Sequence, residues 1–169
     1  QHTYFFNKDG SWDNSPGWKC AESIEVGRYG DDDSATTDNS RANVIKGLEW
    51  HYYDKNGNEV KGWAQIDGEW YYFYEDGVMK NGWVKSGPNW YFMDPAKGGA
   101  MATDGWTEDV YEGWYYVDKN GNYKTGWLQD GNNWYYLKDD GSMAAKEWAK
   151  SGSDWYYMNG IGAMVTGWI

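Results

Sequence analysis

Two ladders of tryptophan with one common period run through most of the chain, and they constrain the fold more than any other feature. In one ladder Trp follows Gly or its equivalent, with steps of 20, 23, 21, 21 and 20 residues. In the other, Trp begins an aromatic cluster, with steps of 20, 20, 24, 20 and 21 residues. The first contains Trp63, Trp83, Trp106, Trp127, Trp148 and Trp168, and the second contains Trp50, Trp70, Trp90, Trp114, Trp134 and Trp155. Such a period indicates six stacked copies of one supersecondary unit over residues 46–169.

One copy, "WYYFYEDGVMKNGW" (70–83), shows what the unit is. Neighbouring residues of a strand point to opposite faces, so Trp70 and Tyr72 share one face and Tyr71 takes the other. The next residues, Glu75-Asp76-Gly77, are a tight-turn signal between aromatic-rich runs. We therefore expect each unit to be a β-hairpin followed by a short loop. A lone hairpin is marginal in water, so the copies should stack into an all-β hairpin solenoid.

Composition supports an elongated stack rather than one central core. The chain has 14 Trp and 16 Tyr, but only 16 of its 169 residues are Leu, Ile or Val. Aromatic rings must therefore supply most of the buried area. A central core of this many Trp would leave indole N–H groups without hydrogen-bond partners, whereas rings spread along a thin stack would not.

Charge and residue counts exclude several functional classes. The net charge of −11 and the pI of 4.5 oppose binding to the phosphates of nucleic acid. No stretch is long and apolar enough to span a membrane. Cys20 has no second cysteine for a disulfide, and no sequence cue pairs it with His2 or His51 for nucleophilic catalysis. The carboxylates are numerous enough for a glycosidase, but they fall mainly at turns, and a hairpin stack offers no deep cleft. We expect no enzyme, no metal and no cofactor in this chain.

The first 45 residues depart from the period. "YFFNKDGSWDNSPGW" (4–18) is a degenerate copy of the unit, and an irregular acidic insertion follows it. Within that insertion Asp31, Asp32, Asp33 and Asp38 could gather Ca²⁺, but their spacing does not match the usual calcium loop. A solvated acidic loop is the alternative. The expected domains are thus residues 1–45 and residues 46–169. The start at Gln1 rather than Met indicates a mature protein or a module cut from a longer one.

The distance from each Gly-Trp indole to the next cluster Trp is nearly constant, at 7, 7, 8, 7 and 7 residues. Two indoles at a fixed separation can form two walls of a pocket, and a Tyr of the following hairpin can form a third. Ring faces attract a quaternary ammonium without a hydrogen bond, by about 0.5–2 kcal/mol for each well-placed ring. This predicts a weak site of roughly millimolar affinity, repeated along the stack. Plain packing of every Trp in the interior is compatible with the same pattern.

The stretches "TGWLQDGNNWYYLKDDGSM" (125–143) and "SDWYYMNGIGAMVTGW" (153–168) resemble the choline-binding repeats of streptococcal and clostridial surface proteins, autolysins and phage lysins. The resemblance covers about residues 46–169. It implies a left-handed β-solenoid that holds choline between consecutive repeats. It also implies a secreted, non-catalytic module that anchors a protein to phosphocholine on teichoic and lipoteichoic acid of the bacterial cell surface, or that belongs to a phage lysin.

The family pattern also implies which rings form each cage: the Gly-Trp indole, the next cluster Trp and a Tyr of the hairpin after that. Carried onto this sequence, the cages are Trp83, Trp90 and Tyr116; Trp106, Trp114 and Tyr136; Trp127, Trp134 and Tyr157; and Trp63 and Trp70 with Phe92. Trp148 and Trp155 have no following hairpin, so a homodimer through the terminal repeat or further sequence would have to close that site.

Two other functions compete with choline binding. Related repeats bind α-glucans, and Asn89, Asn132, Asn133 and Asp154 precede cluster Trp residues where a sugar site would use them. The chain would otherwise be a regulatory or attachment part of a murein hydrolase whose catalytic domain lies elsewhere.

Overall fold

A computed structural model describes residue 5 and residues 11–22 and 48–167 of the chain. The chain divides into two compact units, Gln1–Met101 and Ala102–Ile169. Each unit is described by itself below. In both, the described strands pair only as two-stranded antiparallel hairpins.

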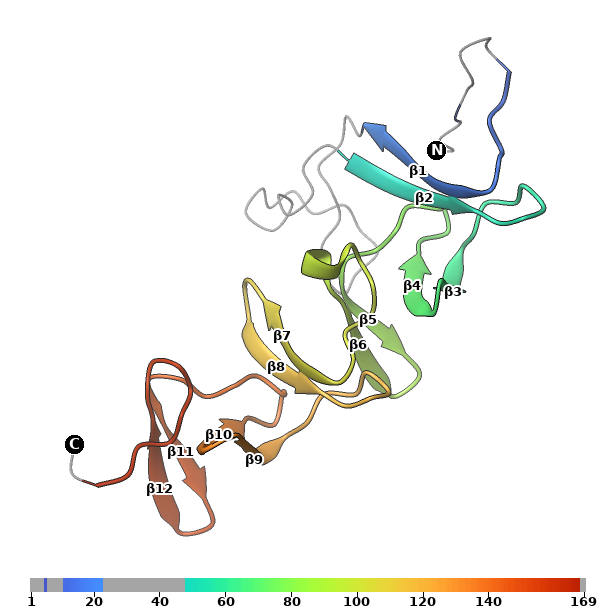
Figure 1. Cartoon of the computed structure of the whole chain (residues 1–169). Coiled ribbons are helices and arrows are strands. Elements are labelled where there is room, and N and C mark those ends of the chain that lie inside the picture. The colour runs from blue at the N-terminus through green and yellow to red at the C-terminus, as the bar shows by residue number, and fades with distance from the viewer. Residues whose placement is uncertain (1–4, 6–10, 23–47, 168–169) are drawn as a thin grey trace. The chain divides into compact units, whose positions relative to one another are not determined.

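The described residues of the first unit form three hairpins and one short helix (Figure 1). Strand β1 (Gly17–Glu22) pairs with β2 (Leu48–Tyr53), β3 (Gly62–Ile66) with β4 (Glu69–Phe73), and β5 (Gly82–Ser86) with β6 (Asn89–Met93). The 3₁₀ helix η1 (Pro95–Lys97) follows β6.

The second unit contains three more hairpins. They pair β7 (Gly105–Asp109) with β8 (Gly113–Val117), β9 (Gly126–Asp130) with β10 (Asn133–Leu137), and β11 (Glu147–Ser151) with β12 (Asp154–Met158). The predicted all-β class built of repeated hairpins is therefore confirmed.

The prediction of which turn closes each hairpin was wrong. The strand that begins with Gly-Trp pairs with the Trp-Tyr-Tyr strand that follows it, so that Trp63 lies opposite Tyr72. The hairpin turn between them is Asp67-Gly68, where φ is 51° and 87°. Two-residue loops with positive φ match the twist of paired strands, which explains Asp-Gly at this position.

The Asp-Gly and Asn-Gly signals after the aromatic clusters instead mark connections between hairpins. In the first unit Gly77 N–H donates to the Tyr74 carbonyl at 2.9 Å, and an isolated bridge joins Phe73 to Met79. These connections are therefore tight turns as predicted, but the strands that they join do not form the hairpin.

The first hairpin crosses the predicted domain boundary. Strand β1 lies before residue 46 and β2 after it, with Trp18 opposite Tyr52. The segment 23–47 is thus an insertion between the two strands of one repeat. The proposed calcium ligands Asp31, Asp32, Asp33 and Asp38 lie outside the described residues, so that question stays open.

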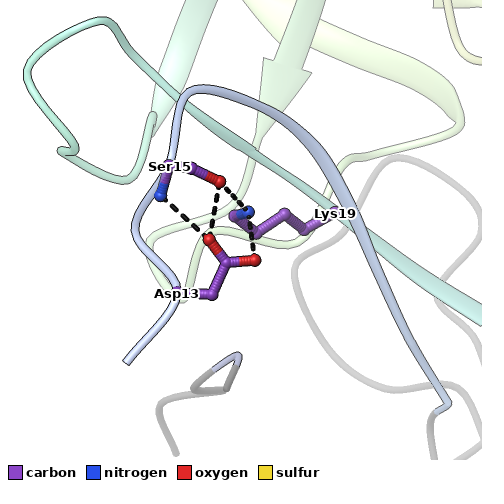
Figure 2. Close-up of polar contacts among 3 residues, drawn as sticks. All are labelled: Asp13, Ser15 and Lys19. Atoms are coloured by element: carbon purple, nitrogen blue, oxygen red, sulfur yellow. Dashed lines mark hydrogen bonds and ion pairs between the residues drawn. The ribbon is translucent and has the colours of Figure 1, made fainter. Parts of the chain in front are cut away.

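A small polar network organises the chain where it enters β1 (Figure 2). Lys19 Nζ donates to Asp13 Oδ2 at 2.8 Å and to Ser15 Oγ at 3.0 Å, while Ser15 N–H and Oγ–H donate to Asp13 Oδ1 at 3.1 and 2.6 Å. The hydrogen bonds from Lys19 and Ser15 favour the ionised carboxylate and lower the pKa of Asp13 to about 2. Residues ahead of β1 are therefore tied to the strand itself.

Backbone hydrogen bonds stack one hairpin on the next within each unit. The residue after each inter-hairpin turn donates its N–H to the carbonyl of the cluster Trp one hairpin earlier. The bonds run from Met79 to Trp50 at 2.7 Å, Met101 to Trp70 at 2.8 Å, Met143 to Trp114 at 2.7 Å and Met164 to Trp134 at 2.7 Å. The stacking thus has a fixed direction, with a forward and a backward face on every hairpin.

Candidate functional site

Each hairpin presents two Trp rings and a third ring on its forward face, and the third ring is a Tyr everywhere except in β5–β6, where it is Phe92. In the hairpin β9–β10, Trp127 lies opposite Tyr136, and Trp134 lies two residues along the same strand face. The centroid of the Trp127 ring is 5.1 Å from that of Tyr136 and 6.4 Å from that of Trp134, at interplanar angles of 66° and 81°. These are edge-to-face contacts rather than parallel stacking.

The following hairpin adds another ring from its backward face. Tyr156, the first Tyr of its cluster, lies 5.0 Å from Trp127 at 80°. The same contact recurs at the other described junctions: Trp18 with Tyr71 at 4.9 Å, Trp63 with Tyr91 at 5.5 Å, and Trp106 with Tyr135 at 5.0 Å. Four junctions therefore repeat one arrangement of perpendicular rings.

The ring of the following hairpin that contacts the Gly-Trp indole is thus the first Tyr of the cluster, whereas the cages expected from the sequence use the second, and that choice of cage residues stays a prediction. In β12, Tyr157 lies 5.3 Å from Trp148 of its own hairpin, and in β10, Tyr136 lies against Trp127 of its own hairpin. Phe92 is buried against Trp83 of its own hairpin at 5.1 Å. The reason is strand alternation: the second Tyr shares the forward face with the Trp, so the backward face that meets the previous repeat carries the first Tyr.

Tyr116 lies 5.2 Å from Trp106 within its own hairpin. Its expected partners Trp83 and Trp90 belong to the first unit and Tyr116 to the second, so this set stays a prediction. At the end of the chain, Trp148 and Trp155 are 52% and 59% exposed. Their closure by a second copy also stays a prediction.

The cluster Trp rings remain accessible although they belong to a ring cluster. Trp70, Trp114 and Trp134 are each 41% exposed. Large rings that are this exposed at the same position of three repeats are not serving only as core. The exposed ring faces are available to a ligand.

The Gly-Trp indoles are held by their edges. Trp106 Nε1 donates to Asp130 Oδ2 at 2.8 Å, and Trp127 Nε1 donates to Ser151 Oγ at 3.0 Å, in each case to the end of the next hairpin's first strand. These bonds satisfy the only polar atom of each ring and leave its faces apolar and electron-rich. Asp130 also adds a negative charge beside the cluster, which favours a cation.

The sequence reasoning did not find the first ring cluster. Trp18 lies 6.4 Å from Trp50, 5.1 Å from Tyr52 and 4.9 Å from Tyr71. The Gly-Trp pair and the cluster belong to one hairpin, but the insertion 23–47 separates them in sequence. The Gly17-Trp18 pair was the sequence signal for this cluster. It begins β1, and the strand that pairs with β1 begins at Leu48, just before Trp50.

Two lysine ammonium groups lie near cluster Trp rings of their own hairpins. Lys85 Nζ lies 5.8 Å from the ring centre of Trp90, and Lys150 Nζ lies 5.7 Å from that of Trp155. Each Lys stands opposite its Trp across the hairpin. An external cation with methyl groups would meet the same attraction and in addition bury apolar surface.

The described residues offer little support for a metal site or a membrane span. They contain no group of three or more His, Cys, Asp or Glu side chains able to hold a metal ion. In the same residues no helix has the length and apolar character to cross a membrane. The repeated ring clusters are the feature that a function must explain.

Comparison with known families identifies the repeats. The family model described as choline-binding repeat matches residues 60–106, and the one described as cell wall binding repeat matches residues 125–143 and 146–164. The chain belongs to the choline-binding repeat family. Comparison with curated protein sequences gave no match.

Solved structures with this fold include a surface protein, an autolysin and a phage-type lysin. Choline binding protein F from Streptococcus pneumoniae is 31% identical with a TM-score of 0.54, over 98% of this chain and 63% of that one. The modular autolysin LytC from Streptococcus pneumoniae is 27% identical with a TM-score of 0.56, over 96% of this chain and 31% of that one. The modular Cpl-1 endolysin, complexed with a peptidoglycan analogue, is 33% identical with a TM-score of 0.52, over 86% of this chain and 39% of that one.

This chain therefore covers less than two thirds of the length of each of these three proteins. The family implies choline as the ligand and the cell surface as the location. No catalytic domain is evident in the matched segments, which are repeats throughout.

Proposed function

We propose that the chain is a non-catalytic attachment module that binds the choline of phosphocholine-bearing teichoic and lipoteichoic acids at the bacterial cell surface. The observation that carries this proposal is the recurrence of one ring arrangement, centred on Trp18, Trp63, Trp106 and Trp127. A purely structural role would not require the cluster Trp to stay exposed at the same position of successive repeats.

The proposed cages use the forward-facing Trp pair of one hairpin and the first Tyr of the next. In the second unit they are Trp127 and Trp134 with Tyr156, and Trp106 and Trp114 with Tyr135. In the first unit they are Trp63 and Trp70 with Tyr91, and Trp18 and Trp50 with Tyr71. Trp83 with Trp90, and Trp148 with Trp155, are the equivalent pairs at the two remaining hairpins.

Choline fits these clusters because its quaternary ammonium has no N–H to donate and carries a diffuse charge. Each well-placed ring contributes about 0.5–2 kcal/mol, so a few rings give a weak single site. The net charge of −11 adds a general attraction for cations. A polymer that carries many choline groups would engage several cages at once, which raises the overall affinity well above that of one site.

The test compares four ligands by titration, with Trp fluorescence and the melting temperature as readouts. Choline and tetramethylammonium should bind in the millimolar range and raise the melting temperature as their concentration rises, since a ligand of the folded state stabilises it. The neutral isostere 3,3-dimethylbutanol should bind far more weakly, because it lacks the cation.

Each other result has a definite meaning. Comparable binding of 3,3-dimethylbutanol would show that the pockets are merely hydrophobic. Binding of dextran without any response to tetramethylammonium would establish the α-glucan function instead.

A further inference from the structure

One ring cluster in the first unit adjoins a pocket that is also lined by an amide and an ammonium group. A pocket of about 480 Å³ is lined on one side by Trp18, Trp50, Tyr71 and Met79, and elsewhere by Asn81 and Lys97. The rings are those of the first junction. The polar pair comes from the stretch before β5 and from η1 after β6.

Asn81 is a buried polar group with an unmet hydrogen bond. Its side chain is only 3% exposed, and Oδ1 has no partner among the described residues. A buried acceptor left without a partner destabilises a fold, so such an atom marks a place where a ligand can complete the hydrogen bonding. The repeats do not require Asn here, because the residue two before the Gly-Trp Trp is Thr125 in one repeat and Lys146 in another.

Lys97 reaches the same pocket because the turn after β6 is longer than its equivalents. Asp94 caps η1 by accepting from Ala96 N–H at 2.9 Å, and Gly98 ends it with φ of 66°. Gly99 keeps the pocket wall open, since a Cβ there would lie 2.6 Å from Met79 Cε and 3.3 Å from Asn81 Oδ1. Within the described residues the Lys97 ammonium has no ion pair.

The charges of this pocket suit a zwitterion better than a simple cation. The rings attract an ammonium, whereas Lys97 repels one and attracts an anion. In phosphocholine two methylene groups and an oxygen separate the quaternary ammonium from the phosphate, so one ligand supplies both charges. A half-turn of the Asn81 amide exchanges its oxygen and nitrogen, which allows it to donate to a phosphate oxygen.

We propose that this pocket binds phosphocholine through both of its charged groups, with the ammonium against Trp18, Trp50 and Tyr71 and the phosphate against Lys97 and Asn81. This inference rests on the proposed choline-binding function and adds a preference for the phosphorylated ligand at one site.

The test follows the indole N–H signals of Trp18, Trp50 and Trp127 by NMR in the full chain during titration with choline or phosphocholine. At Trp18 and Trp50 phosphocholine should bind roughly three- to tenfold more tightly than choline, as expected for one charge-assisted contact. At Trp127 the affinities for choline and phosphocholine should differ by less than twofold.

Two variants and one control then locate the phosphate. Lys97→Ala should remove the preference for phosphocholine at Trp18 and Trp50 while leaving choline binding there unchanged or slightly stronger. Asn81→Ala, which removes the side-chain amide, should reduce the preference about twofold to threefold. Lys119→Ala removes the same charge from an inter-hairpin turn that does not line this pocket, and it should leave the preference intact.

The outcomes separate this inference from the proposed function. Equal affinity for both ligands at Trp18, or a preference that survives Lys97→Ala, would overturn the inference while choline binding at Trp127 upholds the function. A response at Trp127 with none at Trp18 would also overturn it. No response of any indole to choline would refute the function itself.

Discussion

At the scale of single residues, the first and second Tyr of one cluster have different neighbours although they are adjacent in sequence. Tyr156 lies against Trp127 of the previous hairpin, and Tyr157 lies against Trp148 of its own. The two positions therefore give a matched pair of variants that differ in which cage they touch.

We expect Tyr156→Leu to weaken choline binding at Trp127 and Trp134 by roughly tenfold, because a leucine fills space but has no ring quadrupole. Tyr157→Leu should change binding at that site by less than twofold. Choline titration followed on the Trp127 indole signal measures both. A larger effect of Tyr157→Leu would show that the second Tyr closes the cage after all.

The network of Asp13, Ser15 and Lys19 makes a pH-dependent prediction. The pKa of Asp13 is lowered from 3.8 to about 2, so the folded state binds this proton less readily than the unfolded chain. Its stabilising contribution is complete above the unfolded pKa of 3.8 and disappears as the pH falls toward 2. In Lys19→Gln, the Asp13 carboxyl followed by NMR should titrate at a higher pH than in the wild type. An unchanged midpoint would show that Ser15 alone holds the carboxylate.

At the scale of the structural element, the inter-hairpin turns are packed against the previous repeat, whereas the hairpin turns are open. Gly141 has φ of 85°, and a Cβ there would lie 2.4 Å from Tyr123 Cδ2 and 3.1 Å from Tyr115 Cδ1. Gly131 has φ of 59° and no atom within 4 Å of the same position. The two glycines share a backbone requirement and differ in their surroundings.

Gly131→Ala should therefore destabilise the protein by about 1–2 kcal/mol, from the left-handed backbone alone. Gly141→Ala should lose a further ~1–3 kcal/mol because the methyl group displaces a packed aromatic ring. Denaturant unfolding of the two variants measures the difference. Equal losses would mean that the Tyr123 ring moves aside without cost.

At the scale of the whole molecule, two sources of cation binding need to be separated. The net charge of −11 attracts any cation and is screened by salt, because the Debye length falls to about 3 Å at 1 M. Ring faces in partly buried clusters are screened much less. Selectivity for choline should therefore persist where general electrostatic attraction has vanished.

The chain should stay bound to a choline-coated support in about 1 M NaCl and leave it when free choline is added. A variant that combines Trp63→Ala with Trp127→Ala should leave at a lower choline concentration, because it retains fewer cages. The two single variants provide the comparison. Release by salt alone would assign the retention to net charge.

The sequence by itself determined the repeat, the all-β hairpin class and the Trp pairs of the candidate cages other than Trp18 with Trp50. Trp127 and Trp134 could be paired without a structure because the spacing of about seven residues recurs along the chain. That the two residues belong to one hairpin became clear only from the strand pairing.

Only the tertiary structure decided which rings meet across repeats. Alternation places Tyr156 and Tyr157 on opposite faces but does not say which face points to the previous hairpin; the hydrogen bonds between hairpins decide that. The pairing of Trp18 with Trp50 could not be predicted for a related reason, because residues 23–47 separate in sequence the two strands that pair in the structure. Asn81 and Lys97 approach Trp18 through contacts between different repeats, and a sequence period carries no information about such contacts.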